Sequence, residues 1–210
     1  MNVVIVMPAH NEEKTLGATV SKCKKYGTII VINDASADKT AEAAKKSGAV
    51  VITHKINRGL GGALRTGFAA ALKTGADVII TIDADGQHLP EEIPLFLKKI
   101  EEGYDFVLGA RDLSKYPFVK KFGNFFLNGM TNMVSGTHLK DTESGFRAFT
   151  RAALTKLDLK AERYEIAAEI VKEVGRNNLK SANVPITIPI YVKGVGVTDG
   201  IKNFLYILRK

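Results

Sequence analysis

The sequence predicts an α/β fold with a mostly parallel sheet flanked by helices, and three observations support this. Five short β-branched runs alternate with helical patterns through the first half of the chain. These runs are continuously apolar, which indicates strands that are covered by helices on both faces. Repeated strand–helix units favour parallel pairing of the strands. In such sheets ligands bind beyond the carboxyl ends of the strands, so we expect functional residues there.

The elements of the first half follow from these patterns in order. The apolar runs predict strands over residues 3–7, 28–33, 49–53, 77–82 and 105–108. The helical patterns between them predict helices over residues 12–26, 37–47, 61–73 and 90–101. The third of these helices is rich in Ala and Leu, and the fourth opens with Pro90 at its first turn, a favoured position for proline.

The second half is less regular. Residues 114–135 are aromatic and basic, and we expect them to be helical in part. Residues 141–147 read as a polar loop, and residues 163–175 as a helix with a glycine at its end. Residues 184–192 alternate around two prolines, which suggests an edge strand. Residues 199–210 predict a short amphipathic helix that ends in charge.

Length and composition fit one globular domain over residues 1–210, because 45% of the residues are hydrophobic and 25% are charged. The net charge of +8 fits nucleic acid, an anionic membrane or a phosphorylated substrate as partner. The one cysteine, Cys23, cannot form an intramolecular disulfide, which favours a reducing compartment. The chain contains no apolar run near the roughly 20 residues that span a bilayer. We therefore expect a cytoplasmic or membrane-peripheral protein.

Two carboxylates one residue apart follow the fourth predicted strand, in Asp83-Ala84-Asp85-Gly86-Gln87-His88. On a turn that leaves a buried strand they offer hard oxygen ligands, which suit Mg²⁺ or Mn²⁺ and leave positions open for substrate phosphate. Gln87 offers a further oxygen. Asp residues that cap the helix near Pro90 are the alternative, and Asp-x-Asp alone does not decide between the two.

Polar residues also follow the first three strands. Asp34 can accept hydrogen bonds from a base or ribose, or can cap the next helix, where Ser36 is the expected N-cap. Asn11 and Glu12 have the same two interpretations. Residues 57–62, Asn-Arg-Gly-Leu-Gly-Gly, form a turn into a helix, where backbone N–H groups and the charge of Arg58 favour phosphate. This turn lacks the Lys-Ser/Thr of a P-loop.

Residues 141–147, Asp-Thr-Glu-Ser-Gly-Phe-Arg, combine acid, hydroxyl, glycine and arginine in one loop. Arg147, and Arg111 after the fifth strand, are candidate phosphate clamps because the guanidinium fork matches phosphate oxygens. An ordinary loop with solvated arginines is the alternative.

As an ordered set, these loops resemble the family 2 glycosyltransferases, nearest to the branch of dolichol-phosphate mannose synthases and polyprenyl-phosphate glycosyltransferases. The resemblance covers about residues 3–175 and implies a GT-A fold with a mostly parallel, Rossmann-like central sheet. It also implies an inverting mechanism and a metal-bound nucleotide-sugar donor. The motifs that carry it are Pro8-Ala9-x-Asn11-Glu12, Asp34-x-Ser36, Asn57-x-Gly59-x-Gly61, Asp83-Ala84-Asp85-Gly86-Gln87-His88, Gly109-x-Arg111 and Ser144-Gly145-Phe146-Arg147.

The resemblance assigns roles by position. A donor half then spans about residues 1–112, and an acceptor half about residues 113–210. The implied nucleotide-sugar contacts are Pro8, Ala9, Asn11, Glu12, Asp34, Arg58, Asp83, Ala84 and Asp85, and the implied metal ligands are Asp83, Asp85 and Gln87. The implied acceptor-phosphate contacts are Arg111, Lys120, Asn124, Ser144 and Arg147, where Lys120 and Asn124 replace an Arg and a Ser of the family. The expected catalytic residues are Asp85, Arg111, Asp141 and Arg147.

The charge of the acceptor decides whether a base is needed. A sugar hydroxyl needs a general base to remove its proton. A phosphate monoester, whose second pKa is about 6, is largely dianionic at neutral pH and needs positive clamps instead. Arg111, Arg147, Lys120 and Lys121 offer these clamps. If the acceptor is instead a hydroxyl of a glycan, Asp141 is the first candidate for the base.

Residues 116–127 interleave aromatics with lysines, which fits a lipid headgroup region or, equally, a core helix with basic residues outside. Residues 201–210 have the same two interpretations, or dock a membrane protein or a second subunit. We therefore expect a peripheral protein at the cytoplasmic face of an anionic membrane. The family resemblance implies a donor of the GDP-mannose or UDP-glucose type, mannose or glucose as the sugar, and polyprenyl phosphate as the acceptor.

The residues leave three other functions open. A glycosyltransferase acting on a glycan hydroxyl shares the whole donor half. A sugar-nucleotide pyrophosphorylase places its Gly-rich loop directly after the first strand, where this chain has residues 8–12, Pro-Ala-His-Asn-Glu. A basic nucleic-acid-binding module ranks last, because the basic residues are scattered and form no recognised motif, so we expect no nucleic-acid partner.

Overall fold

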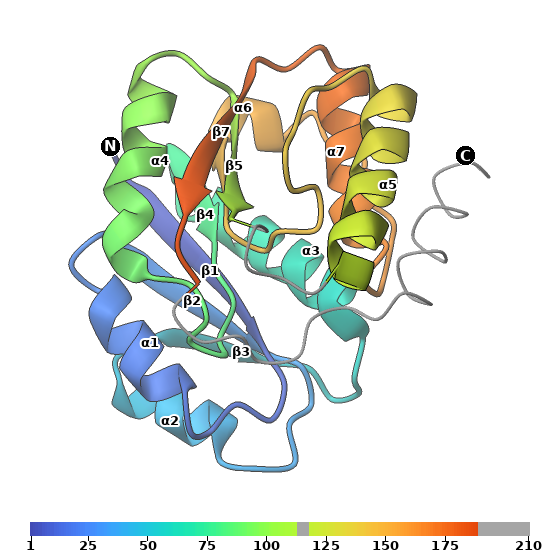
Figure 1. The fold of residues 1–210 in the computed structure, drawn as a ribbon. Coiled ribbons are helices and arrows are strands. Elements are labelled where there is room, and N and C mark those ends of the chain that lie inside the picture. The colour runs from blue at the N-terminus through green and yellow to red at the C-terminus, as the bar shows by residue number, and fades with distance from the viewer. Residues whose placement is uncertain (113–117, 189–210) are drawn as a thin grey trace.

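The structure is a computed structural model that describes residues 1–112 and 118–188, and for residues 118–126 it describes the backbone alone. Within this part of the chain, a seven-stranded sheet lies between layers of helices (Figure 1). The predicted helix over residues 199–210 and the last residues of the strand predicted over 184–192 lie outside the described residues.

The sheet confirms the predicted α/β fold and its mostly parallel pairing. The five strands expected in the first half are present, and β1, β2, β3 and β4 pair in parallel, as do β5 and β7. The strands follow the order β3-β2-β1-β4-β6-β5-β7, so β7 is an edge strand as expected, although it begins at residue 181. Their bounds are β1 Val3–Ala9, β2 Thr28–Asn33, β3 Val50–Thr53, β4 Val78–Thr81, β5 Phe106–Arg111, β6 Arg147–Thr150 and β7 Ser181–Ile186.

The strand β6 was not predicted from the sequence. It lies between β4 and β5 and pairs antiparallel with both, so that Arg147 faces Thr81 on one side and Leu108 on the other. A strand of four residues is too short to show a recognisable alternation of apolar and polar side chains. Because β6 comes from the second half of the chain, it brings Arg147 to the end of β4, next to the predicted metal ligands.

The predicted helices are present with shifted ends. The first begins at residue 16 and not at 12, because residues 12–15 form turns, and residues 118–135 are helical as expected in part. Ser36 is not the N-cap of the second helix; Asp38 accepts the hydrogen bond from the Thr40 N–H instead. The helix bounds are α1 Leu16–Cys23, α2 Thr40–Lys46, α3 Gly59–Lys73, α4 Ile93–Glu101 after the short 3₁₀ helix η1 Pro90–Glu92, α5 Phe118–Ser135, α6 Arg151–Leu154 and α7 Ile166–Arg176.

The sequence predicted that Gly175 ends its helix, but the structure shows that it does not. It lies inside the last turn of α7, where a Cβ atom would overlap the carbonyl group of Ser135 at the end of α5. Glycine is therefore needed for the close crossing of α5 and α7, and the backbone turns left-handed only at Asn178.

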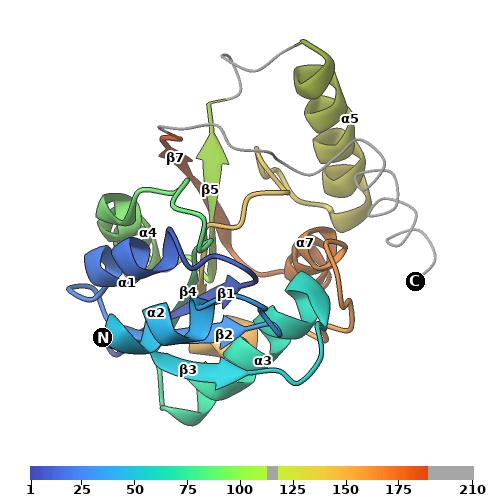
Figure 2. The ribbon, with the colours of Figure 1, turned by 90° about the horizontal axis from the view of Figure 1, so that it is seen from below.

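Figure 2 shows helices on both faces of the sheet, and each face buries its own hydrophobic cluster. Ile5 and Met7 of β1 point to the face covered by α1 and α4, while Val4 and Val6 point to the face covered by α3 and α7. This alternation along a strand is the two-residue period of a pleated sheet. Among the described residues, no helix has the length and apolar character needed to cross a bilayer.

Candidate active site

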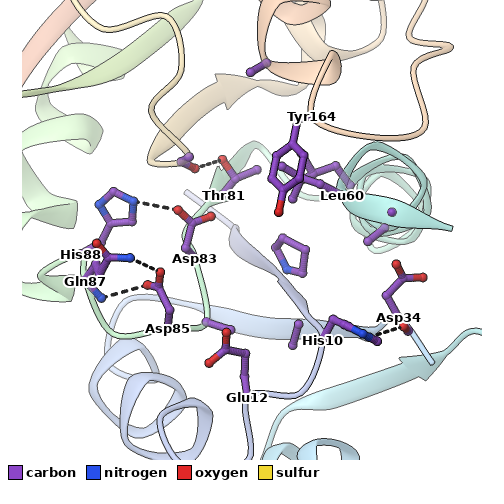
Figure 3. Close-up of a pocket in the computed structure, with 18 of the residues that line it drawn as sticks. His10, Glu12, Asp34, Leu60, Thr81, Asp83, Asp85, Gln87, His88 and Tyr164 are labelled. Carbon is purple, nitrogen blue, oxygen red and sulfur yellow. Dashed lines mark hydrogen bonds and ion pairs between the residues drawn. The ribbon is translucent and has the colours of Figure 1, made fainter. Parts of the chain in front are cut away.

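A pocket of about 650 Å³ lies at the carboxyl ends of β1, β2 and β4, next to Arg111 at the end of β5 (Figure 3). This is the edge of the sheet where the sequence placed the functional residues. Most of the expected site residues line it: Pro8, Ala9, Glu12, Asp34, Asp83, Ala84, Asp85, Gln87, Arg111 and Arg147.

Four expected site residues do not line the pocket: Asn11, Arg58, Asp141 and Ser144. Asn11 joins two loops, since its backbone N–H donates to Ser36 Oγ and its side-chain oxygen accepts from the Ala37 N–H. The side chain of Arg58 lines a separate shallow groove between α3 and β3. The side chains of Lys120 and Asn124 lie outside the described ones.

Asp34 is held rigidly at one end of the pocket. Its Oδ1 accepts a hydrogen bond of 2.8 Å from the Arg58 N–H and lies 2.7 Å from Nδ1 of His54. The other ring nitrogen of His54 lies 3.0 Å from Oγ1 of Thr66 on α3. A chain of three side chains therefore fixes the Asp34 carboxylate, which is an acceptor for the N–H or O–H groups of a ligand.

Asp83 and Asp85 lie together on the opposite side of the pocket from Asp34 (Figure 3). Oδ2 of Asp83 lies 3.0 Å from Nε2 of His88, and both oxygens of Asp85 accept hydrogen bonds from Gln87, one of them from its side-chain amide. A Cβ atom on Gly145 would overlap both oxygens of Asp83, so only glycine permits this placement. The described residues contain no group of three or more His, Cys, Asp or Glu side chains arranged around one point as metal ligands.

The acidic end of the pocket carries concentrated negative charge. Burial raises the pKa of Glu12, and the charges of Asp85, Asp38 and Asp83 raise it further against a hydrogen bond from Thr15. Burial also acts to raise the pKa of Asp83, but the hydrogen bond and charge of His88, with help from two arginines, outweigh it and lower that pKa. Asp83 is therefore ionised at neutral pH, and the field around it attracts cations.

Arg147 brings a buried positive charge next to these acids. Only 2% of the residue is exposed, and its Nε finds no hydrogen-bond partner among the described residues. Burial lowers the pKa of its guanidinium, while the charges of Asp83, Glu143 and Asp141 oppose that shift. An arginine stays protonated under such conditions, so the pocket wall carries a cation that can still donate to a ligand.

Arg111 is held by Asp141. The Nε and Nη2 atoms of Arg111 donate to the two carboxylate oxygens at 2.5 and 2.8 Å, and the backbone N–H of Arg111 donates to the same carboxylate at 3.2 Å. Asp141 is 1% exposed and lies behind Arg111, outside the pocket. Its carboxylate is thus engaged in orienting a pocket residue, and Glu143 is the acid of this loop that lines the pocket.

The glycines of the Gly-rich turn allow a later segment of the chain to approach closely. The Gly62 N–H donates to the carbonyl oxygen of Glu162 at 3.0 Å, and a Cβ atom on Gly59 or Gly61 would overlap the carbonyl groups of residues 162 and 161. The glycines therefore let residues 158–165, here called the strap, lie on the start of α3. The strap brings Arg163 and Tyr164 into the pocket wall.

Several pocket residues were not assigned from the sequence. Four of them lie inside motifs that the sequence analysis recognised, so their sequence positions could have identified them: His10, His88, Glu143 and Gly145. Their contacts could not be predicted. Arg163 and Tyr164 fall where only a helix was expected, and Tyr164 projects into the pocket beside Leu60 (Figure 3). Their approach depends on contacts between segments about 100 residues apart, which leave no local pattern.

Comparisons with known proteins agree with this geometry. An uncharacterized protein, MJ1222, of Methanocaldococcus jannaschii is 43% identical over 224 residues, which cover 99% of this chain and 92% of that protein. The UDP-N-acetylglucosamine–dolichyl-phosphate N-acetylglucosaminyltransferase of Methanococcus voltae is 32% identical over 238 residues, with 98% and 94% of the two chains covered.

The fold also matches that of a solved enzyme. The crystal structure of glucosyl-3-phosphoglycerate synthase from Mycobacterium tuberculosis, in complex with Mg²⁺ and UDP, superposes with a TM-score of 0.80 at 22% identity and covers 98% of this chain and 79% of that one. The shared architecture is the GT-A fold. A family model described as Glycosyl transferase family 2 matches residues 4–158. With its fold and the order of its pocket motifs, the chain belongs to glycosyl transferase family 2.

Proposed function

We propose that this glycosyltransferase moves a sugar from a nucleotide-sugar to a polyprenyl or dolichyl phosphate, with inversion at the sugar carbon. The observation that carries the proposal is that Asp83 and Asp85 share one pocket with Arg147 and Arg111. One side of such a pocket suits a cation-bound diphosphate and the other suits an anionic acceptor. The name of the relative from Methanococcus voltae, an N-acetylglucosaminyltransferase that includes dolichyl phosphate in its name, supports the same acceptor class.

The donor nucleoside lies against Asp34 in this proposal, with Pro8, Ala9 and Glu12 lining its path to the acidic end. Asp83, Asp85 and Gln87 hold Mg²⁺ or Mn²⁺. Their chemistry fits, because they offer hard oxygen ligands, negative charge has accumulated there, and Gly145 leaves space for the Asp83 carboxylate. Mg²⁺ uses few protein carboxylates and takes its other ligands from phosphate and water. When bound, such an ion neutralises the leaving diphosphate.

The acceptor phosphate binds Arg147 and Arg111. Among the described residues, the buried guanidinium of Arg147 finds no partner for its Nε, and a phosphate oxygen would satisfy it. Asp141 presents Arg111 with its guanidinium already oriented, which lowers the entropy lost on binding. Because the acceptor dianion attacks directly, no protein group has to remove a proton. Lys120, Asn124 and Ser144 remain predicted contacts of the same phosphate.

The sugar is mannose or glucose in this proposal, and the protein works at the cytoplasmic face of the membrane that holds its lipid acceptor. The donor half, about residues 1–112, supplies the nucleotide and metal contacts of a single catalytic domain. The acceptor half, about residues 113–210, contains α5 and the basic aromatic stretch of residues 116–127, which is predicted to bind the anionic lipid surface. Residues 201–210 are the predicted docking segment for a membrane protein or a second copy.

A two-step experiment tests the proposal. Thermal-shift screening of GDP-mannose, UDP-glucose and UDP-N-acetylglucosamine, each with and without Mg²⁺ or Mn²⁺, selects the donor. Transfer from that donor is then measured to polyprenyl phosphate and to phosphate-free polyprenol. We expect metal-dependent stabilisation by one donor and transfer to the phosphate alone. Equal rates with both lipids would refute the proposal that the acceptor must carry a phosphate. Full activity under exhaustive chelation would refute the proposed requirement for a divalent metal.

One observation favours a second candidate, transfer to a hydroxyl of a glycan. Glu143 lines the pocket, and a pocket carboxylate is the group that a hydroxyl acceptor needs as its base. Oligosaccharide acceptors tested with the selected donor separate the two functions. For a glycan acceptor, Glu143→Gln abolishes transfer; for a phosphate acceptor, it does not.

A further inference from the structure

Two asparagines one turn apart on α5 hold the loop of residues 137–142. Asn132 accepts hydrogen bonds from Thr137 Oγ1 and the Leu139 N–H at 2.8 and 2.9 Å, and its amide donates to the Leu139 carbonyl at 2.8 Å. Asn128 does the same one turn earlier: its side-chain oxygen accepts from the Thr142 N–H at 2.8 Å, and its amide donates to the Lys140 carbonyl. Residues four apart share one helix face, so together they form a two-point clamp.

The contacts of Asn128 lie on both sides of Asp141. One bond fixes the peptide group before that residue, and the other fixes the peptide group after it. With both neighbours fixed, the direction of the Asp141 side chain is fixed as well. The contacts of Asn132 are confined to residues 137–139 and do not bracket Asp141.

Asp141 passes this constraint to Arg111. Its buried carboxylate receives three hydrogen bonds from Arg111, two from the guanidinium and one from the backbone. Arg111 is the last residue of β5, and its guanidinium reaches the pocket. A continuous series of hydrogen bonds therefore runs from α5 through Asn128, the backbone around Asp141 and the Asp141 carboxylate to the pocket wall.

We infer that Asn128 is a positioning residue that sets the guanidinium of Arg111 for the anionic acceptor, and this inference rests on the function proposed above. Asn128 touches no reacting group; it acts through Asp141. The arrangement makes the position of α5 a determinant of how the acceptor phosphate is held. Donor binding at Asp34 and Asp85 does not depend on this series.

The test compares Asn128→Leu with the matched control Asn132→Leu in the full chain. The first readout needs no substrate: hydrogen exchange of the Arg111 Nε–H by ¹⁵N NMR, with the resonance identified by its loss in Arg111→Lys. We expect Asn128→Leu to speed this exchange by about tenfold or more, because the Asp141 carboxylate loses its fixed direction, whereas Asn132→Leu leaves it unchanged. Asn128→Asp, which keeps the acceptor for Thr142, serves as second variant should the leucine variant not fold.

The second readout is kinetic. With the selected donor and polyprenyl phosphate, Asn128→Leu should lower kcat/KM for the acceptor by about tenfold or more while the KM for the donor stays unchanged. The inference is overturned if the Arg111 Nε–H still exchanges slowly in both Asn128 variants. It is also overturned if Asn132→Leu lowers kcat/KM for the acceptor as much as Asn128→Leu does. If the exchange behaves as expected but the wild-type protein transfers no sugar to polyprenyl phosphate, the positioning role stands and the proposed acceptor fails.

Discussion

Nε2 of the buried His88 lies 3.0 Å from Oδ2 of Asp83, and the His88 ring also contacts Phe146. This one contact counteracts the partial burial of Asp83, because the hydrogen bond and charge of His88 are the largest effects that lower the pKa of that carboxylate. His88 therefore keeps a predicted metal ligand ionised and oriented, a role known for partners of metal ligands in general.

The His88–Asp83 contact predicts how stability depends on pH. The folded pKa of Asp83 lies below its ordinary value of about 3.9, so the ionised carboxylate stabilises the fold above that pH, and this contribution is lost as the pH falls through the folded pKa. His88→Phe keeps the ring and removes the bond, so we expect the acid-unfolding midpoint to move to higher pH. Circular dichroism during acid titration measures this, with exposed His138→Phe as control. An unchanged midpoint would contradict the pKa assignment.

Gly145→Ala is expected to damage the acidic end of the pocket without unfolding the protein. The added methyl group would overlap both Asp83 oxygens, so the carboxylate must move from its present position. We expect the affinity for Mn²⁺ with nucleoside diphosphate to fall by about tenfold or more in calorimetry. Gly129→Ala on α5 meets no atom within 4 Å and should instead stabilise the helix by about 0.5–1 kcal/mol. Equal affinities in the two variants would exclude this role for Gly145.

Asp85→Ala is expected to abolish donor turnover while the fold remains intact. Loss of a metal ligand removes about 4 kcal/mol of transition-state stabilisation, which corresponds to a rate about a thousandfold lower. Donor turnover and thermal unfolding are measured together, with Asp158→Ala as control because its side chain pairs with Lys160 at the surface. Near-wild-type turnover in Asp85→Ala would remove that residue from the proposed metal site.

The strap depends on the buried carboxylate of Glu169. Its Oε2 accepts hydrogen bonds from the N–H groups of Lys160 and Ala161 at 2.9 and 2.8 Å. Glu169→Met keeps the volume and leaves both donors without that acceptor, so we expect the free energy of unfolding in urea to fall by about 1–3 kcal/mol. The exposed side chain of Glu162 provides the control Glu162→Gln. If both variants unfold alike, Glu169 is not needed to hold the strap.

The proposed donor side of the pocket was predictable because its residues follow strands. Asp34 comes directly after β2, and Asp83 and Asp85 come just after β4, while parallel pairing brings these strand ends to one edge. Strand recognition and one topological rule were therefore enough to predict that these side chains lie close together. The contacts of His54 and His88 with these acids required the folded structure.

The proposed acceptor side of the pocket could not be predicted in the same way, because long-range contacts that no local pattern encodes hold its residues in place. Asp141 appeared to be a free carboxylate in a loop, but the end of β5 lies against it and Arg111 occupies both of its oxygens. Gly59 and Gly61 were interpreted only as part of a phosphate-binding turn, but the structure shows that their lack of a side chain also lets the strap approach α3. In both cases the residue types were informative, and their partners came from segments at least 30 residues away in the sequence.

The insertion of β6 between β4 and β5 also constrains the order in which the strands of the sheet can pair during synthesis. On a ribosome, β1 to β4 emerge first and can pair with one another, but β5 emerges with neither neighbour available. Both of its neighbours, β6 and β7, come later in the chain. When synthesis has reached residue 112, β5 is thus unpaired and the edge of β4 that will pair with β6 is still exposed. Arg147 reaches the pocket only when translation has supplied the strand that fills it.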